Sequence, residues 1–284
     1  MNPEPIQLDV QGHVAVLTLN RPDTRNALSG EDMFAAFEVL FERLNSDMNI
    51  RVAVLTGAGS AFCSGGNVAE MRDRTGMFGG TPTQIAANYR AGIQRIPRAF
   101  QTLQVPIIAA VNGAAIGAGN DLACMCDIRI ASDTARFAES FVKVGIVPGD
   151  GGCWLLPRVV GFSRAAEMAL TGDTIDAQEA LRIGLVSRVV PADALLREAL
   201  ALAQRIAANP PQVLRWTKQL LQQARTGTLD EALDTAGKFQ GLAHHTADHA
   251  EAVASFFEKR PPVFGKGIVS QSDTIRAAVN PATP

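Results

Sequence analysis

Two glycine-rich segments, each following a short apolar run, are the parts of this sequence best suited to chemistry. The first is Gly57–Gly66 (GAGSAFCSGG) and the second is Asn112–Gly119 (NGAAIGAG). Backbone N–H groups that leave a strand end without a partner favour negative charge. One N–H from each segment could form an oxyanion hole, which stabilises the charge that develops on a carbonyl oxygen. Such a hole needs an acid or base nearby, and Asp121 lies two residues after the second segment.

Asp121 stands in a stretch that otherwise carries no charge, from residue 115 to residue 126. An acid at the start of a helix is often a surface residue that complements the helix dipole. A partly buried acid in an apolar setting has instead a raised pKa, which suits it to proton transfer. The residues alone leave both interpretations open.

Nucleotide binding is a weaker interpretation of the same glycines. Neither segment has the G-x-G-x-x-G spacing, and the chain has no G-x-x-x-x-G-K-[ST] motif. The glycines could also serve only to permit tight turns. The 26 Lys and Arg residues against 28 Asp and Glu residues give a net charge of −2, which argues against nucleic acid as a partner.

The composition is that of a globular protein, because 47% of the 284 residues are hydrophobic and 19% are charged. We see no apolar run of the roughly 18–20 residues that span a bilayer and no secretion signal, so we expect a cytoplasmic protein without a membrane partner. The four cysteines lack metal-ligand spacing, and we expect buried, reduced thiols. His244, His245 and His249 are a weak metal signal, and we expect solvated side chains and no metal site.

The elements that must position these residues follow from the hydrophobic pattern. His13–Leu19 and Arg51–Thr56 are predicted strands joined by an amphipathic helix, as in a parallel crossover. Each glycine-rich segment follows a strand, the second of which is Pro106–Val111. A long helix is predicted from Thr83 to Leu103, and the chain after residue 163 is mainly helical, including Leu229–Phe257. The pattern therefore predicts an α/β core followed by helices.

Several motifs, in order from Val14 to about Phe264, resemble the enoyl-CoA hydratase/isomerase (crotonase) superfamily. These motifs are Pro106–Asp127 (PIIAAVNGAAIGAGNDLACMCD), Ala61–Met71 (AFCSGGNVAEM), Val144–Gly161 (VGIVPGDGGCWLLPRVVG), Ala169–Asp173 (ALTGD), Ala177–Val190 (AQEALRIGLVSRVV) and Phe256–Arg260 (FFEKR). The resemblance implies a crotonase-like spiral of ββα units with a C-terminal α-helical trimerisation region. It implies a core with the acyl-CoA site over residues 1–195, a helical region over 196–265 and a flexible tail over 266–284. It also implies a homotrimer or a hexamer built as a dimer of trimers.

The resemblance also assigns site residues. The oxyanion hole matches Gly66 and Ala118, where alanine replaces the usual glycine but keeps the N–H group. The residues that match coenzyme A contacts are Arg25, Ala27, Phe256 and Lys259. Arg25 could equally be a solvated loop charge, and the last two could be an ordinary helix end. The loop 76–83 is expected to border the acyl pocket.

The chain departs from the family pattern at the paired glutamates that typically hold and activate a water molecule. Asp121 matches the first and is one methylene shorter, whereas the second matches Phe141, which cannot transfer a proton. Glu139 and Asp150 are the nearby acids that could replace it. Alternatively, Glu139 is a surface acid and Asp150 a turn-forming aspartate bonded to local backbone N–H groups.

These matches imply an acyl-CoA enzyme that hydrates a 2-enoyl-CoA thioester through an enolate stabilised by the oxyanion hole. Asp121, Asp150 and Glu139 are the candidate catalytic residues. No cofactor is expected beyond the coenzyme A that is part of the substrate. A double-bond isomerase is the main alternative, since it needs only one base. A CoA-thioester hydrolase and a non-catalytic family member are further alternatives.

Overall fold

The computed structural model of the protein describes residues 4–265. The chain divides into two compact units, Met1–Ala207 and Ala208–Pro284. The expected tail over residues 266–284 lies outside the described residues. The first unit contains both sheets and all of the glycine-rich segments, so it is the unit that forms the candidate site.

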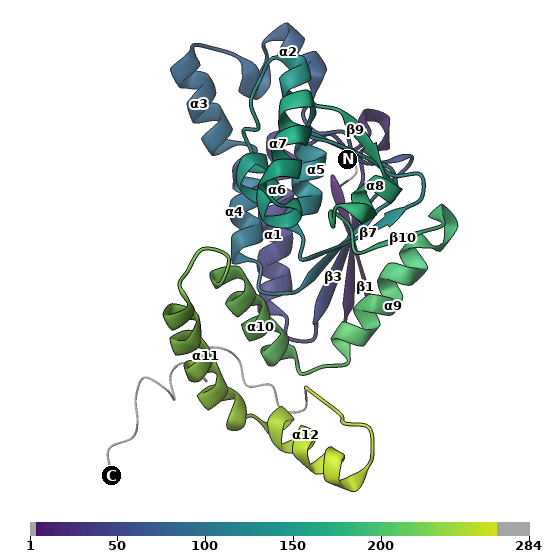
Figure 1. Ribbon diagram of the computed structural model, residues 1–284, viewed down its shortest axis with the longest axis vertical. Helices are drawn as coiled ribbons and strands as arrows, with labels where there is room; N and C mark the ends of the chain where they lie inside the picture. Colours follow the sequence, from purple (N-terminus) through teal and green to yellow (C-terminus); the bar gives the residue numbers. More distant parts are fainter. Residues whose placement is uncertain (1–3, 266–284) are drawn as a thin grey trace. The chain divides into compact units, whose positions relative to one another are not determined.

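A six-stranded sheet runs through the first unit in the order β1-β2-β3-β5-β7-β10 (Figure 1). Its strands are β1 (Ile6–Gln11), β2 (Val14–Leu19), β3 (Val52–Gly57), β5 (Ile107–Val111), β7 (Ile128–Ser132) and β10 (Arg188–Val190). The β1–β2 pair is antiparallel and the other pairs are parallel. Parallel strands covered on both faces are apolar throughout, which explains the unbroken hydrophobic run in β5.

Alternate residues of the strands pack into two separate hydrophobic clusters. Val52 and Val54 of β3 pack with α9 (Leu195–Ala207), whereas Ala53 and Leu55 pack with the larger cluster on the opposite face. That larger cluster contains α1 (Glu31–Ser46) and α4 (Arg95–Thr102). The rings of Phe41 and Phe100 meet edge to face between these helices, with centroids 4.8 Å apart. The sheet is therefore a rigid layer between helices.

A smaller sheet of four strands carries the glycine-rich segments. Its order is β4-β6-β8-β9, and it consists of β4 (Ala61–Cys63), β6 (Ala114–Ile116), β8 (Arg136–Ala138) and β9 (Thr174–Asp176). The first three strands are parallel, and β9 pairs with β8 in the antiparallel direction. The chain passes repeatedly from a strand of the large sheet to a strand of the small sheet and then to a helix. This arrangement confirms the α/β fold with ββα units that the resemblance implied.

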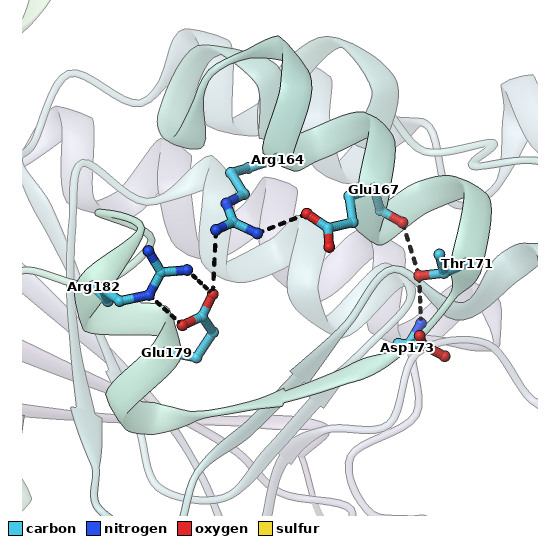
Figure 2. A network of polar contacts seen from close by, with 6 residues as sticks. All are labelled: Arg164, Glu167, Thr171, Asp173, Glu179 and Arg182. Atoms are coloured by element: carbon cyan, nitrogen blue, oxygen red, sulfur yellow. Dashed lines mark hydrogen bonds and ion pairs between the residues drawn. The ribbon is translucent and has the colours of Figure 1, made fainter.

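A network of charged and polar groups holds the edge strand β9 in place (Figure 2). Arg164 of α7 (Phe162–Thr171) pairs with Glu167 and approaches Glu179, which in turn pairs with Arg182 of α8 (Ala177–Arg182). The Asp173 N–H donates to the Thr171 hydroxyl just before β9 begins. Exposed ion pairs contribute little stability individually. The network nevertheless links the segments on both sides of β9. This strand pairs with β8, which is followed directly by Glu139.

The remaining elements of the first unit connect these layers. The helices are α2 (Val68–Asp73), α3 (Pro82–Ala91), α5 (Ala118–Met125) and α6 (Gly152–Val160), and the 3-10 turns are η1 (Pro22–Thr24), η2 (Gly76–Phe78), η3 (Ser140–Val144) and η4 (Ala192–Ala194). The predicted helix from Thr83 to Leu103 is wrong in one respect, because it consists of α3 and α4 with a break at Gly92. A Cβ added at Gly92 would lie 2.8 Å from the Asn88 carbonyl oxygen, so the backbone turns there without a side chain. The strand β1 was not predicted.

The second unit consists of α10 (Pro211–Gln223), α11 (Leu229–His244) and α12 (Ala247–Glu258). The predicted helix over Leu229–Phe257 is therefore two helices. The second begins at an N-cap, Thr246, whose hydroxyl accepts the His249 N–H. The rings of Trp216 and Phe239 stack between α10 and α11. No helix within residues 4–265 is long and apolar enough to cross a membrane.

Candidate active site

The candidate site forms where three neighbouring strands of the small sheet end. β4 leads to Gly66, β6 leads to Ala118 and Asp121, and β8 leads directly to Glu139. Because β4, β6 and β8 are parallel, their carboxyl ends lie at one edge of the sheet. Ligands of open α/β sheets bind at such edges. The sheet therefore brings together three segments that are far apart in the sequence.

The two glycine-rich segments touch each other at Gly65 and Ala118. A Cβ added at Gly65 would lie 3.2 Å from the Ala118 nitrogen and 2.5 Å from the Ile116 carbonyl oxygen. The Ala118 N–H opens α5, where a helix has no internal acceptor. Neither this N–H nor that of Gly66 donates a hydrogen bond to an acceptor within residues 4–265. Two unpartnered donors thus lie on adjoining loops, as an oxyanion hole requires.

Asp121 and Glu139 are both buried, with 0% and 1% of their surfaces exposed. Asp121 lies on α5, and Glu139 is the first residue after β8. An amide nitrogen of the buried Asn120 donates to Glu139 Oε2 at 2.9 Å. Across the described residues, Glu139 Oε1 and both carboxyl oxygens of Asp121 have no hydrogen-bond partner. The surface interpretation of Glu139 and the surface interpretation of Asp121 are therefore both wrong.

Asp150 reaches the same cluster from the turn before α6, which packs beside α5 (Figure 1). Its carboxyl group is 2% exposed, and neither oxygen has a hydrogen-bond partner among residues 4–265. The alternative of a turn aspartate bonded to local N–H groups stays open, because contact with its own backbone N–H lowers the pKa of this carboxyl group against the effect of burial. A Cβ added at Gly152, the first residue of α6, would lie 2.5 Å from Asp121 Oδ1 and closer still to Glu139 Oε1. The glycine leaves room for both carboxyl groups against the helix start.

Burial shifts the protonation of all three acids. Desolvation, reinforced by the charges of Asp150 and Glu139, raises the pKa of Asp121 well above its ordinary value. Desolvation raises the pKa of Glu139 to about 7, against the hydrogen bond from Asn120, which lowers it. Desolvation raises the pKa of Asp150 to about 6. The raised pKa favours the protonated form of Asp121, which suits a proton donor in acid–base catalysis.

Apolar side chains border the donors and the acids. Phe141, in the position of the second family glutamate, lies with its ring against Gly117, where an added Cβ would meet Phe141 Cζ at 3.6 Å. A Cβ at Gly66 would meet Met71 Cε at 2.9 Å and Phe78 Cζ at 3.7 Å. Phe78, at the end of η2, belongs to the loop expected to border the acyl pocket. The sequence motifs gave Met71 no role at the site, and they indicated the loop 76–83 without singling out Phe78.

The segment predicted to bind coenzyme A is anchored to the first oxyanion loop. The Ser64 N–H donates to the Arg25 carbonyl oxygen at 2.9 Å, and the Leu28 N–H donates to the Gly65 carbonyl oxygen at 2.8 Å. Arg25 is exposed with a φ of 53°, and Ala27 is buried. The buried amide of Asn26 supports this turn by donating to the carbonyl oxygens of residues 58 and 61. The Arg25 side chain is therefore available beside the loop that carries Gly66.

Phe256 and Lys259 belong to the second unit. Phe256 is 78% exposed on α12, and Lys259 ends that helix with a φ of 53°. The assignment of both residues to a coenzyme A site stays a prediction.

The prediction of four buried thiols is wrong at one position. Cys63, Cys124 and Cys126 are buried, whereas Cys153 is exposed because it lies on the outer side of the first turn of α6. All four are free. Burial raises the pKa of Cys63 to about 12, so this residue of the first oxyanion loop stays a thiol. Within residues 4–265, no group of three His, Cys, Asp or Glu side chains could hold a metal ion.

Comparison with solved structures agrees with this architecture. The chain resembles an enoyl-CoA hydratase from Bacillus anthracis with a TM-score of 0.85 at 34% identity, over 92% of this chain and 98% of that one. A probable enoyl-CoA hydratase from Mycobacterium bovis is 38% identical over 93% of this chain and 99% of the relative. A 1,2-epoxyphenylacetyl-CoA isomerase from Escherichia coli is also 38% identical, over 90% of this chain and 96% of the relative.

The fold and the paired loop donors define a crotonase-type α/β protein. The sequence pattern of the enoyl-CoA hydratase/isomerase family matches residues 9–267, and the chain belongs to that family.

Proposed function

We propose that this protein hydrates 2-enoyl-CoA thioesters. The observation that carries the proposal is the meeting of two unpartnered backbone N–H groups, from Gly66 and Ala118, with a buried group of three carboxyl side chains at one sheet edge. Several relatives of similar length are named as hydratases, among them a short-chain-enoyl-CoA hydratase from Clostridium acetobutylicum that is 37% identical.

The geometry supports a simple sequence of steps. The thioester carbonyl oxygen accepts the N–H groups of Gly66 and Ala118, which draws electrons from the double bond. A water oxygen bonds to the β-carbon while a neighbouring carboxylate, Glu139 or Asp150, takes one water proton. The resulting enolate is protonated at the α-carbon by Asp121. One proton has then moved from Asp121 to the other acid, and transfer within the cluster restores the starting state.

The same proposal includes how the substrate is held. Arg25 and the backbone at Ala27 would bind the coenzyme A portion beside the first loop, and Phe256 and Lys259 would contribute from the C-terminal helices. We propose no cofactor apart from this part of the substrate. Met71 and Phe78 would contact the acyl group, because they border Gly66.

Double-bond isomerisation is the second candidate function, and a specific observation favours it. Phe141 occupies the position of the second family glutamate, so the usual pair of water-holding glutamates is not present. An isomerase needs a base for one proton and no water. The Escherichia coli isomerase that is 38% identical is consistent with this chemistry in a relative.

The test is mass spectrometry of products formed from a panel of 2-enoyl- and 3-enoyl-CoA thioesters. We expect the mass of a 2-enoyl-CoA to rise by one water. An unchanged mass with a shifted double bond would establish isomerisation instead, and release of free thiol would establish hydrolysis. A panel that yields no product, with CoA thioesters still bound, would favour a non-catalytic family member.

We further propose that the protein acts as a homotrimer or a dimer of trimers in the cytoplasm. The C-terminal helices expose several large apolar side chains that a second copy of the chain would cover, namely Leu229, Leu233, Val253, Phe256 and Phe257. Four cysteines without a disulfide bond among the described residues are consistent with a reducing compartment, where disulfides are rare. Fatty acid metabolism is the setting that such a reaction would serve.

A further inference from the structure

A buried amide lies next to Asp121 and contacts a second acid of the cluster. Asn120 is 0% exposed on α5, and its Nδ2 donates to Glu139 Oε2 at 2.9 Å. The hydrogen bond joins a residue after β6 to a residue after β8. This hydrogen bond orients the carboxyl group of Glu139. The other carboxyl oxygens of Glu139, Asp121 and Asp150 accept no comparable side-chain amide bond among residues 4–265.

The bond leaves the other oxygen of Glu139 facing Asp121. Glu139 Oε1 and both oxygens of Asp121 surround the Cα of Gly152, because a Cβ placed there would contact all three. Glu139 is thus held at one oxygen by Asn120, with its second oxygen directed to the place where Asp121 lies.

Asp150 is held differently. Its neighbour Gly149 accepts a hydrogen bond from Gln94 Nε2 at 2.8 Å, but that bond fixes the backbone of the turn and not the carboxyl group. Neither oxygen of Asp150 has a partner among the described residues. A base that takes a proton from a water molecule must be kept within hydrogen-bond reach of it, and among the described residues no side-chain amide orients the Asp150 carboxyl group as Asn120 orients that of Glu139.

We infer that Glu139 is the second carboxylate of the reaction, in place of the family acid at Phe141, and that Asn120 is the positioning residue that holds it. The inference rests on the proposed hydration. In that step Glu139 Oε1 takes one proton of the water as the water oxygen bonds to the β-carbon, and the pair of electrons of the double bond passes to the thioester enolate. Asp121 then supplies the α-proton, so that one water is added in total.

An amide suits this positioning because it does not titrate in the physiological range. The Asn120 amide remains a hydrogen-bond donor at every pH. Its bond favours the carboxylate form of Glu139 and so lowers the pKa of Glu139 against the effect of burial. Removing the donor therefore both frees the side chain to rotate and makes it harder to ionise. These two consequences distinguish positioning from a general loss of packing.

The experiment compares four variants by their pH profiles of kcat/KM with the 2-enoyl-CoA that the wild type hydrates. Glu139→Gln is expected to lower kcat by about 100-fold or more. The fold loss in kcat of Asp150→Asn is expected to be at least ten times smaller than that of Glu139→Gln. Asn120→Leu is expected to lose about 10- to 100-fold in kcat with little change in KM, and to move the acid limb to higher pH. Asn45→Leu is the matched control, because its amide donates to the Thr102 carbonyl oxygen and accepts the Gln104 N–H, both away from the three acids. It should leave the profile in place.

The double variant Asn120→Leu/Glu139→Gln tests whether Asn120 acts through Glu139. We expect it to be no slower than Glu139→Gln alone, because the amide then has no carboxylate to hold. Multiplied losses would overturn the inference, as would a larger loss in Asp150→Asn than in Glu139→Gln. Asn120→Ser serves if Asn120→Leu does not fold, and it should show a smaller shift of the acid limb because a hydroxyl can still donate.

A second measurement does not depend on the reaction. Urea unfolding of the wild type, Asn120→Leu and Glu139→Gln between pH 5 and pH 9 reports how protons bind to Glu139 in the folded protein. In the wild type, the free energy of unfolding falls with rising pH until Glu139 is ionised in the folded protein. We expect this fall to continue to a higher pH in Asn120→Leu. An unchanged pH dependence would overturn the positioning role. If the wild type hydrates no 2-enoyl-CoA, the proposed function fails while this measurement still decides the pairing of Asn120 with Glu139.

Discussion

Asp121 shows how much the surroundings of one side chain decide. It is shorter by one methylene than the glutamate usual at this position, yet it lies with Glu139 against the start of α6 and close enough to Asp150 for that acid to raise its pKa. Burial beside two other acids raises the pKa of this carboxyl group and so favours its protonated form. The raised pKa makes Asp121 a proton donor, which the enolate intermediate requires.

Replacing Asp121 by asparagine should lower kcat by about 10²- to 10⁴-fold, because asparagine keeps the size and polarity of the side chain but cannot donate a proton to carbon. The measurement is steady-state turnover of the 2-enoyl-CoA that the wild type hydrates. Asp193→Asn, an exposed acid in η4, is the control and should retain wild-type turnover. Unchanged turnover in Asp121→Asn would contradict its assignment as the acid.

At the scale of elements, the site depends on the close approach of two loops. Gly65 has a φ of 86° and faces the carbonyl of Ile116 and the nitrogen of Ala118. A side chain at this position would separate the loops and misplace both donors. The other contact of this kind is at Gly119, where an added Cβ would overlap the carbonyl of Cys63. The two glycines let β4 and α5 meet without an intervening side chain.

Gly65→Ala should therefore reduce kcat/KM by about 10²- to 10³-fold, since loss of a single oxyanion donor has an effect of that size. The control is Gly12→Ala, in the β1–β2 turn. Gly12 has a similar φ of 61°, and an added Cβ there would meet nothing within 4 Å. Gly12→Ala should lose about 1–2 kcal/mol of stability from the left-handed backbone, Gly65→Ala should lose more because of the overlap with Ile116, and only Gly65→Ala should lose activity. Equal activity in the two variants would show that the approach of the loops is not needed.

Sequence reasoning predicted the elements around the site better than the contacts between them. The glycine-rich segments and Asp121 were found because motif residues lie next to one another in the chain. Asn120 was missed, although an amide in an otherwise apolar helix is a signal of a buried polar contact. Glu139 and Asp150 stayed alternatives, because nothing local in the sequence states that β8 and α6 end against α5.

At the scale of the whole molecule, the buried acids oppose folding at high pH. The pKa of Glu139 rises from 4.5 to about 7 on folding, so the folded protein binds more protons than the unfolded chain between these values. Stability therefore falls as the pH rises from about 4.5 to 7 and the contribution is constant above that range. Each unit of pKa corresponds to about 1.4 kcal/mol, which makes the contribution of this group about 3 kcal/mol.

Glu139→Gln removes the titrating group and keeps an amide that can contact Asn120. We expect its stability relative to the wild type to increase between pH 5 and pH 8, by a few kcal/mol, while its activity is lost. Urea denaturation at the two pH values measures this difference. A constant difference across the pH range would mean that Glu139 titrates at the same pH in the folded and unfolded states.

The C-terminal unit leads to a prediction of assembly. Sedimentation equilibrium should give three or six copies of the chain at micromolar concentration, because exposed side chains such as Leu229, Leu233 and Phe257 are too numerous on short helices for a stable monomer surface. A monomer over the whole concentration range would contradict the proposed trimer.

The sequence by itself determined the fold class, the family and the residues that begin each loop of the site. These are local properties, since strand and helix patterns and glycine positions depend on neighbours in the chain. Only the tertiary structure decided which acids meet. Asp121, Glu139 and Asp150 come from three segments whose distance depends on the parallel pairing of β6 with β8 and on the packing of α6 against α5. Burial and mutual repulsion, which alter their protonation, exist only once those segments are packed together.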